Sequence, residues 1–323
     1  MTNVSKGDKV LLSFSYCEEC AACKSGHPSY CHTFNDRNFG GKRHNGTAAA
    51  SIAAGKDGQE KIPLHSTFFG QSSFARNALV HRTSLVKVPP ETDLALFAPL
   101  GCGIQTGAGA IINTLDSKPG SAVAVFGVGS VGLSAVMAAA KIRKARTVIA
   151  IDRHTSRLEL AKRLGATHAI LAAPGTNVAA EILKICPPLG VDSALDTTGV
   201  PAVIETMISA LTAKGRSASV GAPGPGVRVS IEIMDHLVLG RSYMGCVEGD
   251  SVPSEVRISI PQSFALLLTS TSATQFVPYL IERHAKGELP LEEFITYYPL
   301  SEYKKAFDDS LDGTTVKAVL KWE

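Results

Sequence analysis

The stretch Ala122-Val-Ala-Val-Phe-Gly-Val-Gly-Ser-Val-Gly132 decides the fold. An apolar run of strand length leads into Gly127, Gly129 and Gly132, and an alanine-rich helical pattern follows. Glycines so spaced permit a tight turn, let backbone amides approach a pyrophosphate at a helix N-terminus, and let helix and strand pack closely. Asp152 ends the next apolar run, where a carboxylate can accept hydrogen bonds from ribose hydroxyls. The sequence therefore predicts a dinucleotide site.

Asp152 also affects the choice between NAD and NADP. A 2′-phosphate would meet the carboxylate of Asp152, which favours NAD over NADP, although the neighbouring Arg153 could soften that preference. The alternative interpretation is an ordinary glycine-rich strand-to-helix turn, with Asp152 as a solvated acid at a strand end.

Strand and helix patterns alternate through the middle of the chain. Apolar runs lie at 122–126, 147–151, 169–171, 193–195 and 217–220. Between them the clearest helix is Ser156–Leu164, with Gly165 placed to end it. Such alternation predicts an α/β fold with a doubly wound parallel sheet, here over residues 101–245.

The flanking regions differ from this middle part. Residues 1–100 contain short β-like runs such as Lys9–Leu12 and Ala78–Val80 between long loops, which indicates an irregular, mainly β region. After residue 246 we expect a helix near Phe276–Lys286, a strand at Phe294–Tyr298 and a helix around Ser301–Ser310.

Composition and charge narrow the class of protein. The chain has 323 residues, 45% of them hydrophobic, with 32 Lys and Arg against 29 Asp and Glu and no basic block. We therefore expect a small-molecule partner and no nucleic acid. The uncharged run Ala122–Ala140 has the length of a membrane helix, but its glycines argue against a membrane. No leader pattern precedes Val10, which predicts a cytoplasmic protein.

Four of the seven cysteines are crowded into one loop. Cys17, Cys20, Cys23 and Cys31 follow C-x2-C-x2-C-x7-C. Four thiolates can enclose one tetrahedral zinc ion and leave no position for a substrate, which describes a structural site. An iron–sulfur cluster is the rival, although its usual spacing differs. Two disulfides or free thiols are the plain alternative, which an odd cysteine count in a reducing compartment disfavours.

These features together resemble the zinc-containing medium-chain alcohol dehydrogenases, of the aryl or benzyl alcohol type. The likeness covers nearly the whole chain. It is carried by residues 7–10 (Gly-Asp-Lys-Val), the 17–31 loop, 69–75 (Phe-Gly-Gln-Ser-Ser-Phe-Ala), 100–107 (Leu-Gly-Cys-Gly-Ile-Gln-Thr-Gly), the dinucleotide turn and 196–199 (Asp-Thr-Thr-Gly). The resemblance implies a partial GroES-like catalytic domain at 1–100 to which 246–323 returns, an NAD domain at 101–245, and a homo-oligomer.

The resemblance also implies roles for single residues. Cys102 would be a ligand of a catalytic zinc and Thr106 would lie beside the nicotinamide. Arg157 would contact the coenzyme ribose, the backbone at Val220 would face the carboxamide, and Lys317 would approach the pyrophosphate. Without the family, Cys102 is an ordinary small buried residue.

The family's activity is hydride transfer between NAD and an alcohol, here a primary, aromatic or bulky one, and the style hints at fungal secondary metabolism. Relatives carry segments before Gly7 that complete the catalytic zinc site, so we expect an N-terminally truncated chain whose structural zinc site is complete and whose catalytic one is not. Two alternatives follow: a pseudoenzyme that binds NAD and zinc, or a zinc-independent NAD(P)H reductase.

Residues 256–275 are an expected insertion relative to the family. Their ends suit a retained in-frame intron, and a family-variable surface loop is the alternative.

Overall fold

The computed structural model describes residues 4–43, 45–54, 60–71, 74–254 and 276–322. The expected insertion at 256–275 and the residues Ser72 and Ser73 of one family segment lie outside these ranges.

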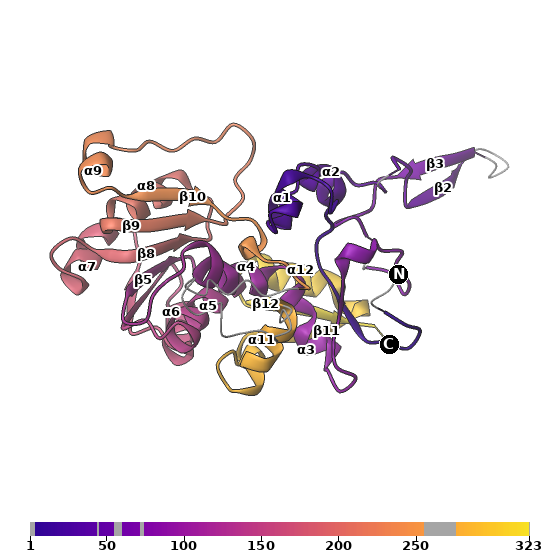
Figure 1. The fold of residues 1–323 in the computed structure, drawn as a ribbon. Coiled ribbons are helices and arrows are strands. Elements are labelled where there is room, and N and C mark those ends of the chain that lie inside the picture. The colour runs from indigo at the N-terminus through magenta and orange to yellow at the C-terminus, as the bar shows by residue number, and fades with distance from the viewer. Residues whose placement is uncertain (1–3, 44, 55–59, 72–73, 255–275, 323) are drawn as a thin grey trace, which may run out of the picture.

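A six-stranded parallel sheet forms the part of the molecule on the left in Figure 1. Its strands are β5 (Ala122–Phe126), β6 (Thr147–Asp152), β7 (His168–Leu171), β8 (Val191–Asp196), β9 (Leu211–Ser219) and β10 (Ser242–Gly245). They lie in the order β10-β9-β8-β5-β6-β7 and pair in parallel throughout. The strand order reverses between β5 and β8, which is where open α/β sheets bind ligands. The predicted doubly wound fold is confirmed.

Helices cover both faces of this sheet. They are α4 (Gly103–Gly109), α5 (Ser130–Met137), α6 (Thr155–Leu164), α7 (Val178–Ile185), α8 (Pro201–Ser209) and α9 (Ile233–Val238). The predicted helix at Ser156–Leu164 is confirmed as α6, and Gly165 ends it with φ 123°. α4 and α5 each continue into a π-helical turn, at Ala110–Thr114 and Ala138–Ile142.

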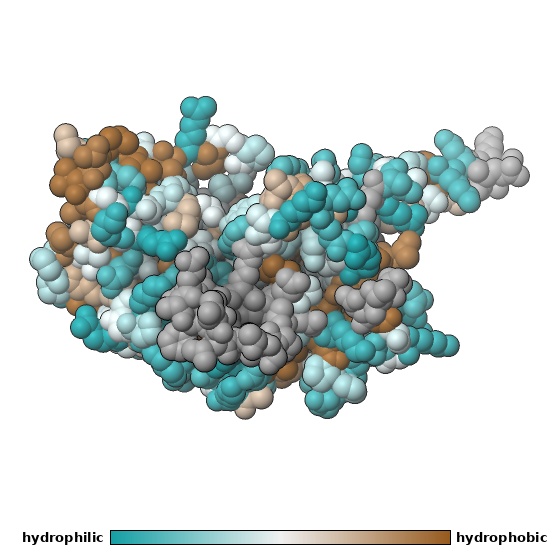
Figure 2. Space-filling view, in the orientation of Figure 1, coloured by the Kyte–Doolittle hydropathy of each residue, from teal (hydrophilic) through white to brown (hydrophobic). Residues whose placement is uncertain are grey.

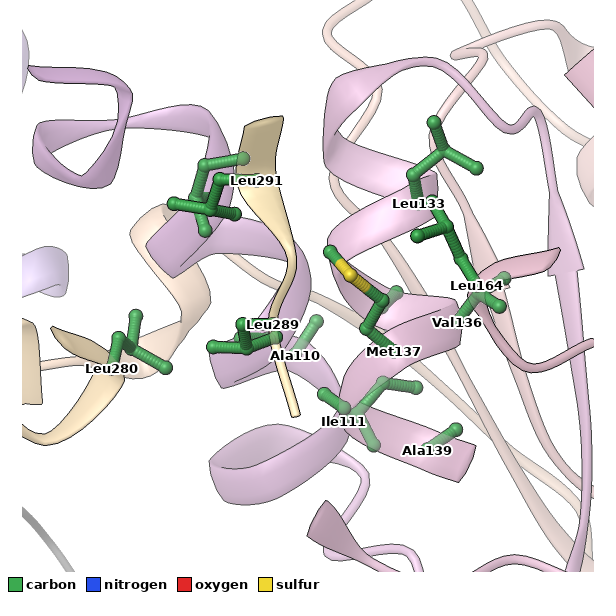
Figure 3. Close-up of a cluster of buried hydrophobic side chains, with 14 of the residues drawn as sticks. Ala110, Ile111, Leu133, Val136, Met137, Ala139, Leu164, Leu280, Leu289 and Leu291 are labelled. Atoms are coloured by element: carbon green, nitrogen blue, oxygen red, sulfur yellow. The ribbon is translucent and has the colours of Figure 1, made fainter. Parts of the chain in front are cut away.

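The central strand divides the core into two layers because successive side chains point to opposite faces. Val123 and Val125 belong to one buried cluster, and Ala122, Ala124 and Phe126 belong to the other. Figure 3 shows how α4 and α5 meet in the first cluster, and how three leucines from the C-terminal part of the chain complete it. These are Leu280, Leu289 and Leu291, all without solvent exposure. The C-terminal part is therefore tied to the nucleotide-domain core.

The rest of the chain forms short elements beside the sheet. In the N-terminal part these are β1 (Val10–Leu12), α1 (Ala21–Lys24), α2 (Phe34–Phe39), β2 (Ala50–Ala54), β3 (Glu60–Leu64), β4 (Leu85–Lys87) and α3 (Leu94–Phe97). In the C-terminal part they are α11 (Phe276–Ala285), β11 (Ile295–Pro299), α12 (Tyr303–Leu311) and β12 (Lys317–Lys321). The three elements predicted after residue 246 are confirmed with small shifts of their ends.

Pairing among these strands is local. β1 pairs with β4 and β2 with β3, both antiparallel, whereas β11 and β12 are parallel. The β2–β3 hairpin projects from the body of the molecule (Figure 1). The β-like run at Ala78–Val80 was a wrong prediction: these residues form no regular structure and Leu79 is exposed. A three-residue apolar run carries too little alternation to specify a strand, and no described strand pairs with it.

Short 3-10 turns complete the architecture, at Pro28–Tyr30 (η1), Arg82–Ser84, Ala98–Gly101, Glu248–Asp250 (η6), Leu291–Glu293 and Leu300–Glu302. Within the described ranges, no single helix passes a test of length and apolar composition for a membrane span. One bent pair, Leu94–Gly101 with Gly103–Thr114, passes it by length and composition when its two halves are taken together.

Gly132 fixes the approach of α5 to the strand that precedes it. A Cβ atom on Gly132 would lie 1.9 Å from the carbonyl oxygen of Gly127, a backbone atom that cannot rotate away. Gly127 in turn has φ 82°, in the left-handed region that favours glycine.

We expect Gly132→Ala to lower the free energy of unfolding by about 3 kcal/mol, because the added methyl group must displace backbone at the dinucleotide turn. Urea unfolding measures this difference. Gly224→Ala is the matched control, since nothing lies within 4 Å of its Cβ position; it should change the free energy by less than about 0.5 kcal/mol. Equal effects of the two substitutions would contradict the prediction.

Candidate functional site

A cavity of about 790 Å³ opens at the carboxyl ends of the central strands. Five predicted cofactor residues line it: Gly127, Gly129, Asp152, Arg153 and Arg157. The opposite wall is formed by residues 310–313, at the end of α12. The cavity thus lies between the parallel sheet and the C-terminal part of the chain.

The carboxylate of Asp152 is held at the mouth of the glycine turn. One oxygen accepts from the backbone N–H of Val128 at 2.8 Å, and the other accepts from that of His154 at 2.9 Å. The guanidinium of Arg157 lies beside the same turn, 3.3 Å from where a Cβ on Gly129 would be. Gly129 therefore leaves room for a basic side chain next to the turn, as a phosphate-binding site requires.

A second acid, Asp196, fixes the loop that follows β8, on the other side of the point where the strand order reverses. Asp196 is fully buried at the end of β8, and its two oxygens accept from the backbone N–H groups of Thr198 (2.9 Å) and Gly199 (3.1 Å). Thr197 donates its hydroxyl to the carbonyl of Gly127 at 2.9 Å. The Asp-Thr-Thr-Gly segment thereby braces the dinucleotide turn rather than facing the cavity with its acid.

Three of the predicted cofactor residues, Gly132, Val220 and Lys317, do not line this cavity. The backbone N–H of Val220 donates to the carbonyl of Asp196 at 2.9 Å, and its side chain packs against the core. Lys317 begins β12, where its charge acts on Cys102. Gly132 lies beneath the turn, where it serves packing. The structure does not test the contacts to NAD predicted for these residues.

Cys102 and Thr106 lie one helical turn apart at the start of α4. The hydroxyl of Thr106 donates to the carbonyl of Cys102 at 2.8 Å. The thiol of Cys102 is open to solvent, but surrounding protein atoms and the nearby carboxylate of Glu248 raise its pKa to about 12. Its hydrogen-bond partner is that carboxylate, with Sγ 3.5 Å from Oε1.

Glu248 is the site residue that sequence reasoning missed. Its side chain is only 8% exposed, and burial raises its pKa to about 7. Its Oε2 atom accepts from the amide of Gln105 at 3.0 Å and from the hydroxyl of Thr106 at 3.5 Å. An acid inside the segment Cys-Val-Glu-Gly-Asp (246–250), just after the edge strand β10, was the available signal.

The turn that carries Glu248 is tightly held. Glu248, Gly249 and Asp250 all have positive φ, at 50°, 69° and 45°. The amide of Asn113 donates to the carbonyl of Gly249 at 3.0 Å, and the hydroxyl of Ser251 donates to that of Glu248 at 2.6 Å. These bonds fix an uncommon backbone conformation that directs the carboxylate inward.

The four cysteines of the N-terminal loop come together as predicted. The sulfur atoms of Cys17, Cys20, Cys23 and Cys31 all lie within 4.8 Å of one another. Those of Cys17 and Cys23 are 3.8 Å apart, well beyond the disulfide length of about 2.05 Å. Thiolates bound tetrahedrally at about 2.3 Å from zinc are separated by about 3.8 Å, so the spacing fits one such ion.

Local groups shift the pKa values of two thiols of this cluster in opposite directions. The backbone N–H of His32 points at the sulfur of Cys20 at 3.5 Å and lowers the pKa of that thiol to about 6, whereas burial raises that of Cys23 to about 12. The cluster also abuts the Glu248 turn, because Nδ1 of His27 lies 2.7 Å from a carboxylate oxygen of Asp250.

Comparisons with known proteins place the chain in a family. The family model described as a zinc-binding dehydrogenase matches residues 130–264, and that of the alcohol dehydrogenase GroES-like domain matches residues 1–90. The chain is 36% identical over 315 residues to geraniol dehydrogenase of Castellaniella defragrans, covering 97% of this chain and 77% of that protein.

Solved structures agree with this match. An alcohol dehydrogenase zinc-binding domain protein from Burkholderia ambifaria is 41% identical with a TM-score of 0.86, covering 99% of this chain and 78% of that one. Benzyl alcohol dehydrogenase from Acinetobacter calcoaceticus is 37% identical with a TM-score of 0.83, covering 100% and 79%. The chain belongs to the zinc-containing medium-chain alcohol dehydrogenase family, and it is an oxidoreductase of that family.

The shifted pKa of Glu248 predicts a pH-dependent stability. The carboxyl group keeps its proton in the folded protein up to about pH 7 but loses it near 4.5 in the unfolded chain. Its contribution to stability is therefore fully present below pH 4.5 and is lost as the pH rises through 7. Relative to Glu248→Gln, chelator-treated wild type should lose about 3 kcal/mol between pH 4 and 8. Urea unfolding across that range checks this, and a constant difference between the two proteins would contradict it.

Proposed function

We propose that the chain is an NAD-dependent zinc alcohol dehydrogenase that interconverts a primary, aromatic or bulky alcohol and its aldehyde. The close crossing of α4 and α5 is the main support. A Cβ on Gly107 would lie 1.9 Å from the carbonyl of Val131, and one on Gly103 would contact Val131 at 3.5 Å. The Cys102–Thr106 segment is thereby pressed against the helix that begins at the dinucleotide turn.

In this proposal, different residues around the cavity bind different parts of NAD. The N-terminal amides of α5 and the guanidinium of Arg157 suit the pyrophosphate, and the carboxylate of Asp152 suits the ribose hydroxyls. Thr106 belongs to the segment that faces α5, and within this proposal it keeps the place beside the nicotinamide that the family resemblance implies. Within this proposal Val220 and Lys317 keep the carboxamide and pyrophosphate roles that the family resemblance implies.

The proposal places zinc at two positions. The four-cysteine cluster suits a structural ion in number, spacing and ligand type. At Cys102 the described residues offer one ligand of the kind that the family uses, the thiol, with the carboxylate of Glu248 beside it, so this site is incomplete in the chain as given. Bound NAD would supply the hydride exchange, and bound zinc would polarise the alcohol oxygen.

The relatives support the substrate class. Geraniol and benzyl alcohol, after which two of them are named, are both primary alcohols with a bulky carbon skeleton. A pseudoenzyme that binds NAD without turnover, and a zinc-independent NAD(P)H reductase, are the competing proposals. Oxidation of NADH by benzaldehyde, measured with and without a zinc chelator, separates all three.

We expect Asp152→Asn to weaken NADH binding about tenfold, because hydrogen bonds to a charged group contribute about 1.5–3 kcal/mol. NADPH binding should not weaken, since the repulsion of a 2′-phosphate is removed. Calorimetric titration measures both constants. Asp36→Asn, on the exposed face of α2, is the control and should leave both unchanged. Unaltered NADH affinity in Asp152→Asn would refute the assignment.

We further propose a cytoplasmic homodimer whose subunits meet at β10 and α9. β10 is an edge strand, and exposed Ile233, Met234, Leu237 and Val238 form an apolar patch on α9. Figure 2 shows this patch at the corner of the molecule where α9 lies. Open strand edges and large apolar patches are typical of subunit contacts. The double substitution Met234→Glu and Leu237→Glu should give a folded monomer in sedimentation velocity, and an unchanged mass would exclude this interface.

A further inference from the structure

Residues 310–313, at the end of α12, form the wall of the 790 Å³ cavity that lies opposite the parallel sheet. Leu311 in this wall is 86% exposed, more than any other large apolar side chain that the structure describes. A single exposed leucine is common on a protein surface, but this one lines a cavity. Its side chain is therefore open to whatever the cavity binds.

The lining of the cavity indicates which half of a dinucleotide it would hold. Asp152, suited to the adenosine ribose, lines it together with Gly129 of the glycine turn. Thr106 and Val220, which the family resemblance assigns to the nicotinamide end, do not. The lining continues instead to Val178 at the start of α7. The wall at 310–313 therefore faces the adenosine half.

The wall also lies against the basic residues beside the ribose position. A Cβ atom on Gly313 would lie 3.5 Å from Nη2 of Arg157 and 4.0 Å from Cε1 of His154. The other terminal nitrogen of Arg157, Nη1, lies 3.3 Å from the Cβ position of Gly129. Arg157 thus reaches from the glycine turn to the C-terminal wall, so a nucleotide held beside its guanidinium would also be close to the wall.

Hydrogen bonds hold the wall in place. The hydroxyl of Tyr298 donates to a carboxylate oxygen of Asp309 at 2.6 Å and lies 2.6 Å from the hydroxyl of Thr315. The backbone N–H of Thr315 donates to the carbonyl of Asp309 at 2.8 Å, and Gly313 between them has φ 86°. Leu311 is therefore presented by a segment that is already ordered, which lowers the entropy cost of binding a ligand there.

We propose that Leu311 is a coenzyme-binding residue, whose side chain packs on the adenosine half of the dinucleotide. Val200, after β8, lines the same cavity from the sheet side and is 48% exposed. Two exposed apolar side chains in one cavity suit a flat purine ring, since ligand sites bury apolar surface and use few polar groups for orientation. This inference rests on the proposed function, because it concerns the same coenzyme.

Calorimetric titration of the full chain with NADH and with adenosine monophosphate (AMP) tests the assignment. Leu311→Ala should weaken both ligands by the same factor, roughly fivefold, because both contain the adenosine that covers this side chain. Leu311→Met should restore most of the affinity, since methionine keeps an apolar surface of similar size. Phe307→Ala is the matched control. Phe307 lies one turn earlier on α12, is 55% exposed and does not line the cavity, so both ligands should bind this variant as they bind wild type.

The two ligands separate this inference from the proposed function. Affinities of Leu311→Ala within about twofold of wild type, a loss for NADH but not for AMP, or an equal loss in Phe307→Ala would overturn the role of Leu311. Wild type that binds AMP but not NADH, with AMP weakened in Leu311→Ala, would defeat the proposed function and leave that role in place. NADH binding that Leu311→Ala does not alter would do the reverse, and binding of neither ligand would defeat both.

Discussion

The candidate site depends on the contact between α4 and α5, two helices that approach each other closely at Gly107. Gly107 lies so close to the carbonyl of Val131 that any larger residue would force the helices apart. α5 begins at the dinucleotide turn, and α4 begins at Cys102. A shift of one helix against the other would move the thiol relative to the nucleotide cavity, and the core is too tightly packed to absorb it.

A second constraint runs through residues 246–251. This segment leaves the edge strand β10, packs its Gly249 against Gly109 of α4, and places Glu248 beside Cys102. Asp250 at its end contacts His27, which belongs to the loop that carries the four cysteines. The loop that carries the four cysteines is therefore in direct contact with the turn that bears the carboxylate of Glu248.

The sequence predicted the nucleotide domain well because its signals are local. Three glycines, an acid and alternating apolar runs each act within a few residues, and the strand order follows from the topology they specify. The four-cysteine cluster was likewise predictable from spacing alone. Glu248 was not, since it meets Cys102 across 146 residues, and the close approach of Gly249 to α4 that brings them together is a tertiary contact. The wrong strand prediction at Ala78–Val80 is the opposite case, because the local pattern is present but no described strand pairs with it.

The family resemblance implied cofactor contacts for residues that the structure does not place in one cavity. Asp152 and Arg157 share one cavity with the glycine turn, whereas Val220 and Lys317 do not. Lys317 instead lies close enough to Cys102 for its positive charge to lower the pKa of that thiol, while Glu248 raises it. Lys317 in β12 and Glu248 in η6 thus shift the pKa of the thiol in opposite directions, and neither element belongs to the parallel sheet. The pKa of this thiol is consequently set in part by residues of β12 and η6, whereas the thiol itself lies at the start of α4.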